Sequence, residues 1–319
     1  MYTGKELNLR VGEAKQTMQK SVLVLGSTCV DVIIRLERLP KTEENLRPLG
    51  QRFAMGGCAY NVANVLGRAG ADVTFVTPVG LRGVYGPYVL PILNKQPWVK
   101  PVLLPEAENG CCYCLVEASG ERTFLSVHGT EYSFMSDWMA PYRNRRFDYG
   151  YVCGLELEEP TGGTLVTWLE KEAVETVLYA PGPRGLRVPA ERTERLLSLH
   201  PMLHLNEAEA RMLSGCDGLE TAARTLASRT GNSVVVTLGA DGALALDAQG
   251  QLSHLPACPV PHVADTIGAG DAHAGALLLG LSRGLSLQEA CALANRGAAQ
   301  AVMQTGATLS DEALRQALA

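Results

Sequence analysis

The chain has 319 residues, of which 46% are hydrophobic and 19% charged, a composition typical of soluble globular proteins. This length allows two ordinary domains or one large α/β domain with an insert. The formal net charge is −5 and no long run of lysine and arginine occurs, so bulk charge does not support binding of nucleic acid or of an anionic membrane.

The chain begins with a polar, weakly patterned stretch, residues 1–20, which we expect to be an N-terminal extension and to which we assign no function. It has no apolar run suited to a signal peptide, and no window approaches the ~20 apolar residues of a membrane helix. The nine cysteines form no CxxC pairs, which fits a reducing compartment. We therefore expect a soluble, cytoplasmic protein.

The first half of the chain contains short strand patterns and one helix. Strands are expected at 21–26, 30–34, 73–79, 111–117 and 122–127, the last two as a hairpin. A helical pattern covers 60–69 between the paired glycines at 56–57 and Gly70. Residues 80–108 are rich in proline and do not favour any one element.

The cysteines are densest in the predicted strand at 111–117, where Cys111, Cys112 and Cys114 stand in an apolar run. Packing within the strand is the favoured interpretation. A zinc site needs ligands in paired, returning spacings, and these are missing.

From residue 148 onward, short apolar runs alternate with helical patterns. The expected strands are 149–153, 176–180, 202–205 and 233–238, and the helices between and after them are 163–172, 190–199, 207–213 and 219–229. Three further helices are expected at 270–282, 286–303 and 310–318. This rhythm is typical of βαβ units and predicts a mainly parallel sheet covered by helices.

Two segments, at about 30–54 and 109–130, do not fit the alternating rhythm. We expect them to form a small separate sheet that projects from one α/β domain spanning 21–319 and covers a cleft.

The run from Asp265 to Gly275 has the glycines and small residues expected at a helix N-terminus. Glycines at 268 and 270 let the backbone approach a ligand closely, and unpaired first-turn amides favour an anion. Asp271 would lie beside that anion, where it suits the role of a base. The alternative is an ordinary helix start with packing glycines and a favourable first-turn charge.

Three other motifs precede this run in the chain. A glycine pair, Gly56-Gly57, comes before a helix that carries Asn61. Asn206 and Glu209 follow a predicted strand in Asn-x-x-Glu spacing. The last motif, at 237–242, stands at another strand end.

Taken together and in this order, these motifs resemble the ribokinase-like (PfkB) family of carbohydrate kinases over about residues 21–319. The patterns at 109–117 and 120–124 are most similar to an uncharacterised enterobacterial branch of sugar kinases.

The resemblance implies a doubly wound, mainly parallel α/β sheet covered by helices on both faces, with a small β-sheet lid. It identifies Asp271 with the catalytic base that takes the proton from a substrate hydroxyl, which then attacks the γ-phosphate of ATP. Gly268, Ala269 and Gly270 would form the anion hole, and Mg²⁺ would bridge the phosphates.

The resemblance also implies the remaining site residues. The substrate-binding residues are Asp31, Gly56, Gly57 and Asn61. The ATP-binding residues are Thr237, Gly239, Gly242 and Asn295. The metal-site residues are Asn206 and Glu209 for Mg²⁺ through water, and Asp265 and Thr266 for a monovalent cation, with potassium activation left open.

Several of these residues have simpler structural interpretations. Asp31 could cap a turn, Asn206 could be a helix N-cap, and Asn295 could be an ordinary helix residue. Two arginines, Arg82 and Arg184, could reach the substrate or a phosphate or could lie on the surface. Ribokinase has a lysine where this chain has Cys58, which argues against ribose as the substrate.

Other functions compete with a sugar kinase. Residues 280–284 match the Gly-x-Ser-x-Gly pattern of serine hydrolases but are predicted to end a helix rather than to join a strand to a helix. His200 and His204 are four apart, but a proline between them argues against a shared metal site. A non-catalytic sugar- or nucleotide-binding protein would keep the cleft without needing Asp271.

Within the kinase class, a sugar is the favoured substrate and a nucleoside the alternative. A nucleobase would need an apolar wall. Aromatic and histidine side chains in or near the lid could supply it: Tyr113, Phe124, His128, Tyr132 and Phe134. Lid sheets with an open face often pair between subunits, so we also expect a homodimer through the lid.

Overall fold

The computed structural model describes residues 19–171 and 174–319, so nearly all of the expected N-terminal extension lies outside the described residues. Within them, nine strands form one sheet in the order β13-β12-β11-β10-β9-β8-β1-β4-β5. Neighbours from β11 to β5 are parallel, whereas β12 and β13 run antiparallel. The strands are β1 Val22–Leu25, β4 Val73–Arg82, β5 Val99–Glu108, β8 Phe147–Cys153, β9 Val174–Ala180, β10 Met202–Asn206, β11 Val234–Thr237, β12 Ala243–Leu246 and β13 Leu252–Leu255.

Helices cover both faces of this sheet, because successive side chains of a strand point to opposite sides. Val22 and Val24 of β1 pack in one core with residues of α1, α8 and α9, whereas Leu23 and Leu25 pack in a second core with residues of α4, α5 and α7. The α-helices are α1 Cys58–Arg68, α2 Tyr85–Leu93, α3 Gly154–Glu158, α4 Gly162–Lys171, α5 Ala190–Leu197, α6 Glu207–Ser214, α7 Leu219–Thr230, α8 Ala269–Ser282, α9 Leu287–Val302 and α10 Asp311–Leu318. Short 3₁₀ helices occur at Thr130–Tyr132, Ser136–Tyr142, Gly185–Arg187 and Gly239–Asp241. The predicted doubly wound α/β class is confirmed.

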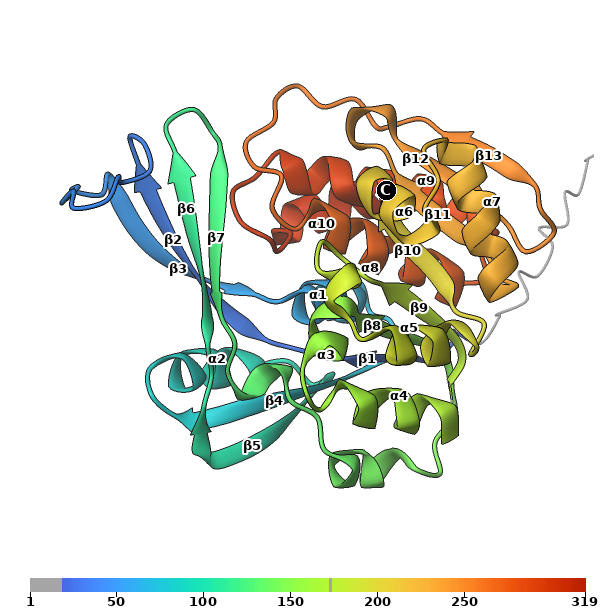
Figure 1. The fold of residues 1–319 in the computed structure, drawn as a ribbon, viewed down its shortest axis with the longest axis horizontal. Coiled ribbons are helices and arrows are strands. Elements are labelled where there is room, and N and C mark those ends of the chain that lie inside the picture. Colours follow the sequence, from blue (N-terminus) through green and yellow to red (C-terminus); the bar gives the residue numbers. More distant parts are fainter. Residues whose placement is uncertain (1–18, 172–173) are drawn as a thin grey trace, which may run out of the picture.

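A second sheet of four strands, in the order β3-β2-β6-β7, projects at the left of the larger domain in Figure 1. Its strands are β2 Cys29–Leu36, β3 Gly50–Gly56, β6 Cys111–Glu117 and β7 Arg122–Val127. The two segments that did not fit the alternating rhythm therefore pair with each other, and β6 and β7 form the predicted hairpin. We call this sheet the lid.

The proline-rich segment at 80–108 forms regular structure that its sequence pattern did not reveal. After β4 ends, α2 forms with Pro91 inside it, and β5 then adds an edge strand parallel to β4. The β12–β13 hairpin was also not expected, because strands of four residues are too short to show a clear period.

One alternative function is tested directly by the fold. The Gly-x-Ser-x-Gly run at 280–284 ends α8, and Ser282 is buried with its hydroxyl donating to the Leu279 carbonyl, so it is not a nucleophile elbow. In the described part of the chain, no helix combines the length and the apolar character needed to cross a membrane.

Candidate active site

The carboxyl ends of the central parallel strands and the N-terminus of α8 surround a cavity of about 210 Å³. Its lining includes Cys153 at the end of β8, His204 on β10, Thr237 on β11 and Asp271 on α8. Ligands of open α/β sheets bind at this edge, because strand-end loops and helix N-termini converge there.

The N-terminus of α8 provides the expected anion site. Gly268 has φ 76°, and a Cβ atom there would lie 2.6 Å from the Cα atom of Ala307, so only glycine fits. The first-turn amides have no acceptor within the helix, although the Ala269 N–H donates to the Thr266 carbonyl at 3.3 Å. Gly268 and Gly270 line the cavity and present this positive helix end to it.

Asp271 lies in the first turn of α8 and is held by a residue from a distant segment. The Asn61 side-chain amide donates to its Oδ2 atom at 2.8 Å. Burial raises the pKa of Asp271 above its ordinary value, and the Asn61 hydrogen bond acts in the opposite direction. A carboxylate with a raised pKa, fixed beside an anion site, has the properties of a general base.

Asp31 lies on β2 of the lid, with only 9% of its surface exposed. Burial and then the negative charge of Asp271 raise its pKa to about 6, so the two carboxylates interact across the site. A side chain at Gly56 would clash with the Asp31 carboxylate, and Gly57 has φ 99° with the Ser27 carbonyl 2.6 Å from where a Cβ would be. Both glycines are therefore required by close contacts. Of the four predicted substrate-binding residues, Asn61 contacts Asp271 directly, and none of the four lines the cavity.

Asn206 and Glu209 form a capping box at the start of α6. The Glu209 amide donates to Asn206 Oδ1 at 2.8 Å, and the Glu209 carboxylate accepts from both the backbone and the side chain of Asn206. Burial, followed by the charge of Asp271, raises the pKa of Glu209. The N-cap interpretation of Asn206 is thus confirmed, and both residues also line the cavity.

Thr237 and Gly239 border an open groove of about 460 Å³ that shares Asn206 with the cavity. Gly242, at φ 91°, precedes β12, and a Cβ atom there would clash with the Leu255 carbonyl oxygen, which leaves no room for a side chain. The groove extends the cavity away from Asp271 along the ends of β10 and β11.

Asn295 is buried on α9 and lines neither the cavity nor the groove, although it bonds the same Leu255 carbonyl that lies against Gly242. Its Oδ1 atom accepts from His273 Nε2 at 3.2 Å, and its Nδ2 atom donates to the carbonyls of Leu255 and Pro256. Because His273 Nε2 carries the proton, its Nδ1 atom accepts from His204 Nε2 at 2.9 Å. Burial lowers the pKa of both histidines, so this chain of hydrogen bonds joins two neutral rings.

Asp265 and Thr266 are engaged by a residue from the lid. Arg122 of β7 forms an ion pair with Asp265 Oδ1 at 2.9 Å and donates to the Thr266 hydroxyl at 2.8 Å. The Asp265 carboxylate also accepts from the amides of Ile267 and Gly306. This contact links the tip of the lid to the loop that leads into the anion site.

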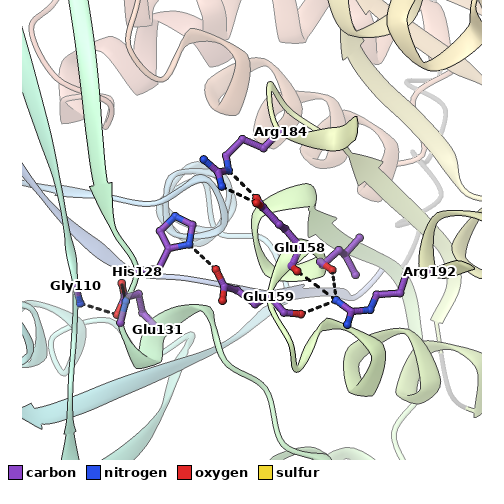
Figure 2. Close-up of polar contacts among 9 residues, drawn as sticks. Gly110, His128, Glu131, Glu158, Glu159, Arg184 and Arg192 are labelled. Atoms are coloured by element: carbon purple, nitrogen blue, oxygen red, sulfur yellow. Dashed lines mark hydrogen bonds and ion pairs between the residues drawn. The ribbon is translucent and has the colours of Figure 1, made fainter. Parts of the chain in front are cut away.

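The base of the lid is joined to the loop after α3 by a second polar network (Figure 2). Glu131 is buried and accepts from the Gly110 amide at 2.9 Å, and His128 Nδ1 lies 2.5 Å from Glu159 Oε1. Arg184 binds Glu158 through two hydrogen bonds of 2.5 and 2.6 Å, so its guanidinium is already paired.

Sequence reasoning did not assign Arg122 or His204 to the site. A charged residue inside a lid strand was the available signal for Arg122, but only the fold shows that it reaches Asp265. For His204, the spacing to His200 was misleading, since His200 instead bonds the Thr230 carbonyl. Arg82 pairs with Glu106 on the surface, so of its two interpretations the structure supports the surface one.

Comparison with known proteins gives consistent matches. The family model described as pfkB family carbohydrate kinase matches residues 19–314. The Escherichia coli K12 protein called uncharacterized sugar kinase YegV is 33% identical over 91% of both chains, and mouse ketohexokinase is 28% identical over 85% of this chain and 92% of its own. The crystal structure of ribokinase from Thermotoga maritima superposes with a TM-score of 0.78 at 20% identity, covering 94% of this chain and 99% of that one.

Proposed function

Because the chain belongs to the pfkB family of carbohydrate kinases, it is an ATP-dependent phosphotransferase that acts on an alcohol group, and we propose Asp271 as its catalytic base. The observation that carries this proposal is the position of Asp271, which lines the cavity at the N-terminus of α8 and accepts a hydrogen bond from Asn61 of α1. The acceptor hydroxyl would give its proton to Asp271 and then attack the γ-phosphate.

The amides of Gly268, Ala269 and Gly270 would stabilise the charge on the transferring phosphoryl group. Asn206, Glu209, Thr237, Gly239 and Gly242 would lie along the rest of the nucleotide. Asn295 has its whole amide engaged, so we assign it the role of positioning the segment at Leu255 and Pro256 rather than of contacting adenine.

We propose Mg²⁺ as the metal cofactor and consider potassium as a second ion. Oxygen donors at Asn206 and Glu209, with Asp271 close enough to raise the Glu209 pKa, fit Mg²⁺ held through water. When bound, Mg²⁺ would neutralise phosphate charge. The Asp265 carboxylate is engaged by Arg122 and two amides, so a potassium ion near Asp265 and Thr266 would need backbone carbonyls as ligands. Assays with and without each ion test both assignments.

The acceptor is proposed to be a small sugar held by Asp31, Asn61 and the glycine pair at 56–57. A carboxylate can accept hydrogen bonds from two neighbouring hydroxyls.

The side chains considered for a nucleobase wall are mostly engaged elsewhere. Tyr132 and Phe134 are buried, and the His128 ring stacks on the Tyr132 ring with 4.3 Å between the ring centroids. The Tyr113 hydroxyl lies 3.3 Å from the Tyr85 hydroxyl. Phe124 is the exception and stays half exposed. Because the other four side chains are buried or engaged, we favour a sugar over a nucleoside.

A coupled assay of ADP formation tests the proposal against a panel of sugars and nucleosides. Turnover should depend on one class of acceptor, and Asp271→Asn should lower kcat by about 10²–10⁴-fold, the usual contribution of a general base. Glu220→Gln makes the same acid-to-amide change at an exposed ion pair with Arg224 and should leave turnover unchanged. Full activity of Asp271→Asn would refute the base assignment, and no acceptor-dependent ADP would favour a binding protein.

We further propose a cytoplasmic homodimer formed through the lid. All nine cysteines are free, as expected in a reducing compartment. Phe53 on β3 and Leu125 and Val127 on β7, the two edge strands of the lid, are about half exposed, and an open apolar sheet face favours pairing. A monomer in light scattering would contradict the dimer.

A further inference from the structure

The inner face of the lid brings two thiols next to Asp31. In the register of β2 with β6, Asp31 pairs with Cys112 and Ile33 pairs with Cys114. Since alternate residues of a strand share a face, Asp31, Cys112 and Cys114 all point to the same side. Asp31 and Cys114 are buried and Cys112 is half-buried.

The spacing of these side chains suits a metal ion. One ligand atom from each residue lies within 4.8 Å of the other two, and the two Sγ atoms are 3.9 Å apart. Two zinc–sulfur bonds of about 2.3 Å at a tetrahedral angle would place their sulfur atoms roughly 3.8 Å apart. The dithiol is therefore already spaced as a pair of ligands.

A disulfide between these cysteines is excluded by the strand itself. Residues two apart in a strand are separated by about 6.5 Å, and their Cβ atoms point the same way. A disulfide requires Cβ atoms about 3.5–4.5 Å apart, so closing it would break the pairing of β6.

We propose that Asp31, Cys112 and Cys114 form a binding site for a thiophilic divalent cation such as Zn²⁺. Two thiolates and one carboxylate are ligands that Zn²⁺ accepts, and three protein ligands leave a fourth position for water. The sequence did not reveal this site because the third ligand comes from β2, far from the Cys-x-Cys pair in the chain.

The site has a consequence for activity. Asp31 is proposed to accept hydrogen bonds from the sugar hydroxyls, so a cation bound to Asp31 would compete with the sugar and inhibit the kinase. This consequence rests on the proposed function of Asp31, whereas metal binding itself does not.

Titration of reduced, metal-free protein with Co²⁺ tests binding without reference to activity. We expect one Co²⁺ per chain with thiolate-to-cobalt charge-transfer absorption that Zn²⁺ abolishes by displacement. Cys112→Ser and Cys114→Ser should each weaken binding by at least about tenfold, because even outer partners of metal ligands contribute 10–100-fold. Cys258→Ser, which removes a half-buried thiol outside the lid, is the matched control and should bind normally.

Circular dichroism of each variant establishes that it is folded, and Asp31→Asn provides a second test that keeps both thiols. Absence of the charge-transfer band in the wild type, or its full retention in folded Cys112→Ser and Cys114→Ser, would overturn the site. In the activity arm, Zn²⁺ should raise the apparent KM for the sugar in the wild type but not in Cys112→Ser. An equal rise in both proteins would overturn the competition while leaving the kinase assignment intact.

Discussion

Asp31→Asn should make the protein more stable at neutral pH while impairing sugar binding. Asp31 is buried beside Asp271, and these two effects raise its pKa from 3.8 to about 6. The folded protein therefore resists ionisation of this group more than the unfolded chain does. The stability that the protein has with a protonated Asp31 side chain is fully present below pH 3.8 and is lost as the pH rises through about 6.

The size of this effect follows from the two pKa values. A shift from 3.8 to about 6 corresponds to ~3 kcal/mol of unfolding free energy lost at pH 8, and to ~1.6 kcal/mol at pH 5. Asparagine has the same shape and does not ionise. We expect Asp31→Asn to gain about 1.4 kcal/mol more stability at pH 8 than at pH 5.

Urea unfolding followed by tryptophan fluorescence at both pH values measures this difference. Asp311→Asn is the matched control, because a hydrogen bond from Arg68 lowers the pKa of Asp311. Its contribution to stability is lost only as the pH falls below about 4, so the effect of Asp311→Asn should be the same at pH 5 and pH 8. In an Asp271→Asn background the pKa of Asp31 should fall, which should shrink the effect of Asp31→Asn. A gain at pH 8 no larger than at pH 5 would refute the reasoning.

Three further predictions concern other parts of the site. Burial lowers the pKa of His273 to about 4, so the free energy of unfolding should fall by about 3 kcal/mol as the pH drops from 6.5 to 4. A His204→Leu/His273→Phe variant should show a flatter pH profile in urea unfolding, and an unchanged profile would contradict this. Gly268→Ala should lower kcat by at least ~10²-fold, because a side chain there meets Ala307 and displaces the anion site; Gly250→Ala, at a turn glycine with open space, is the control in the same kinetic assay. Arg122→Ala should reduce kcat/KM by about tenfold or more, because it leaves the buried Asp265 carboxylate without its cation and detaches the lid tip; steady-state kinetics that match the wild type would rule out that role.

Features that depend on nearby residues could be predicted from the sequence. The alternation of strands and helices after residue 148 indicated the parallel sheet, because hydrophobic period and glycine positions reflect local conformation. The start of α8 at Gly268–Asp271 and the capping box of Asn206 and Glu209 each involve residues within four positions of each other, so their spacing was informative. Family resemblance added the chemical roles.

Features that depend on contacts between distant segments came only from the tertiary structure. Asn61 meets Asp271, Arg122 meets Asp265 and His204 meets His273 because strand register and helix packing bring separate segments together.

Sheet register likewise placed Cys112 and Cys114 beside Asp31, which their spacing in the chain could not show. For the same reason, the side-chain amide of Asn295 forms all its hydrogen bonds within the protein, to His273 and to the Leu255 carbonyl among others. The sequence by itself therefore determined which chemistry is present, and packing decided which groups meet and which are left free to act.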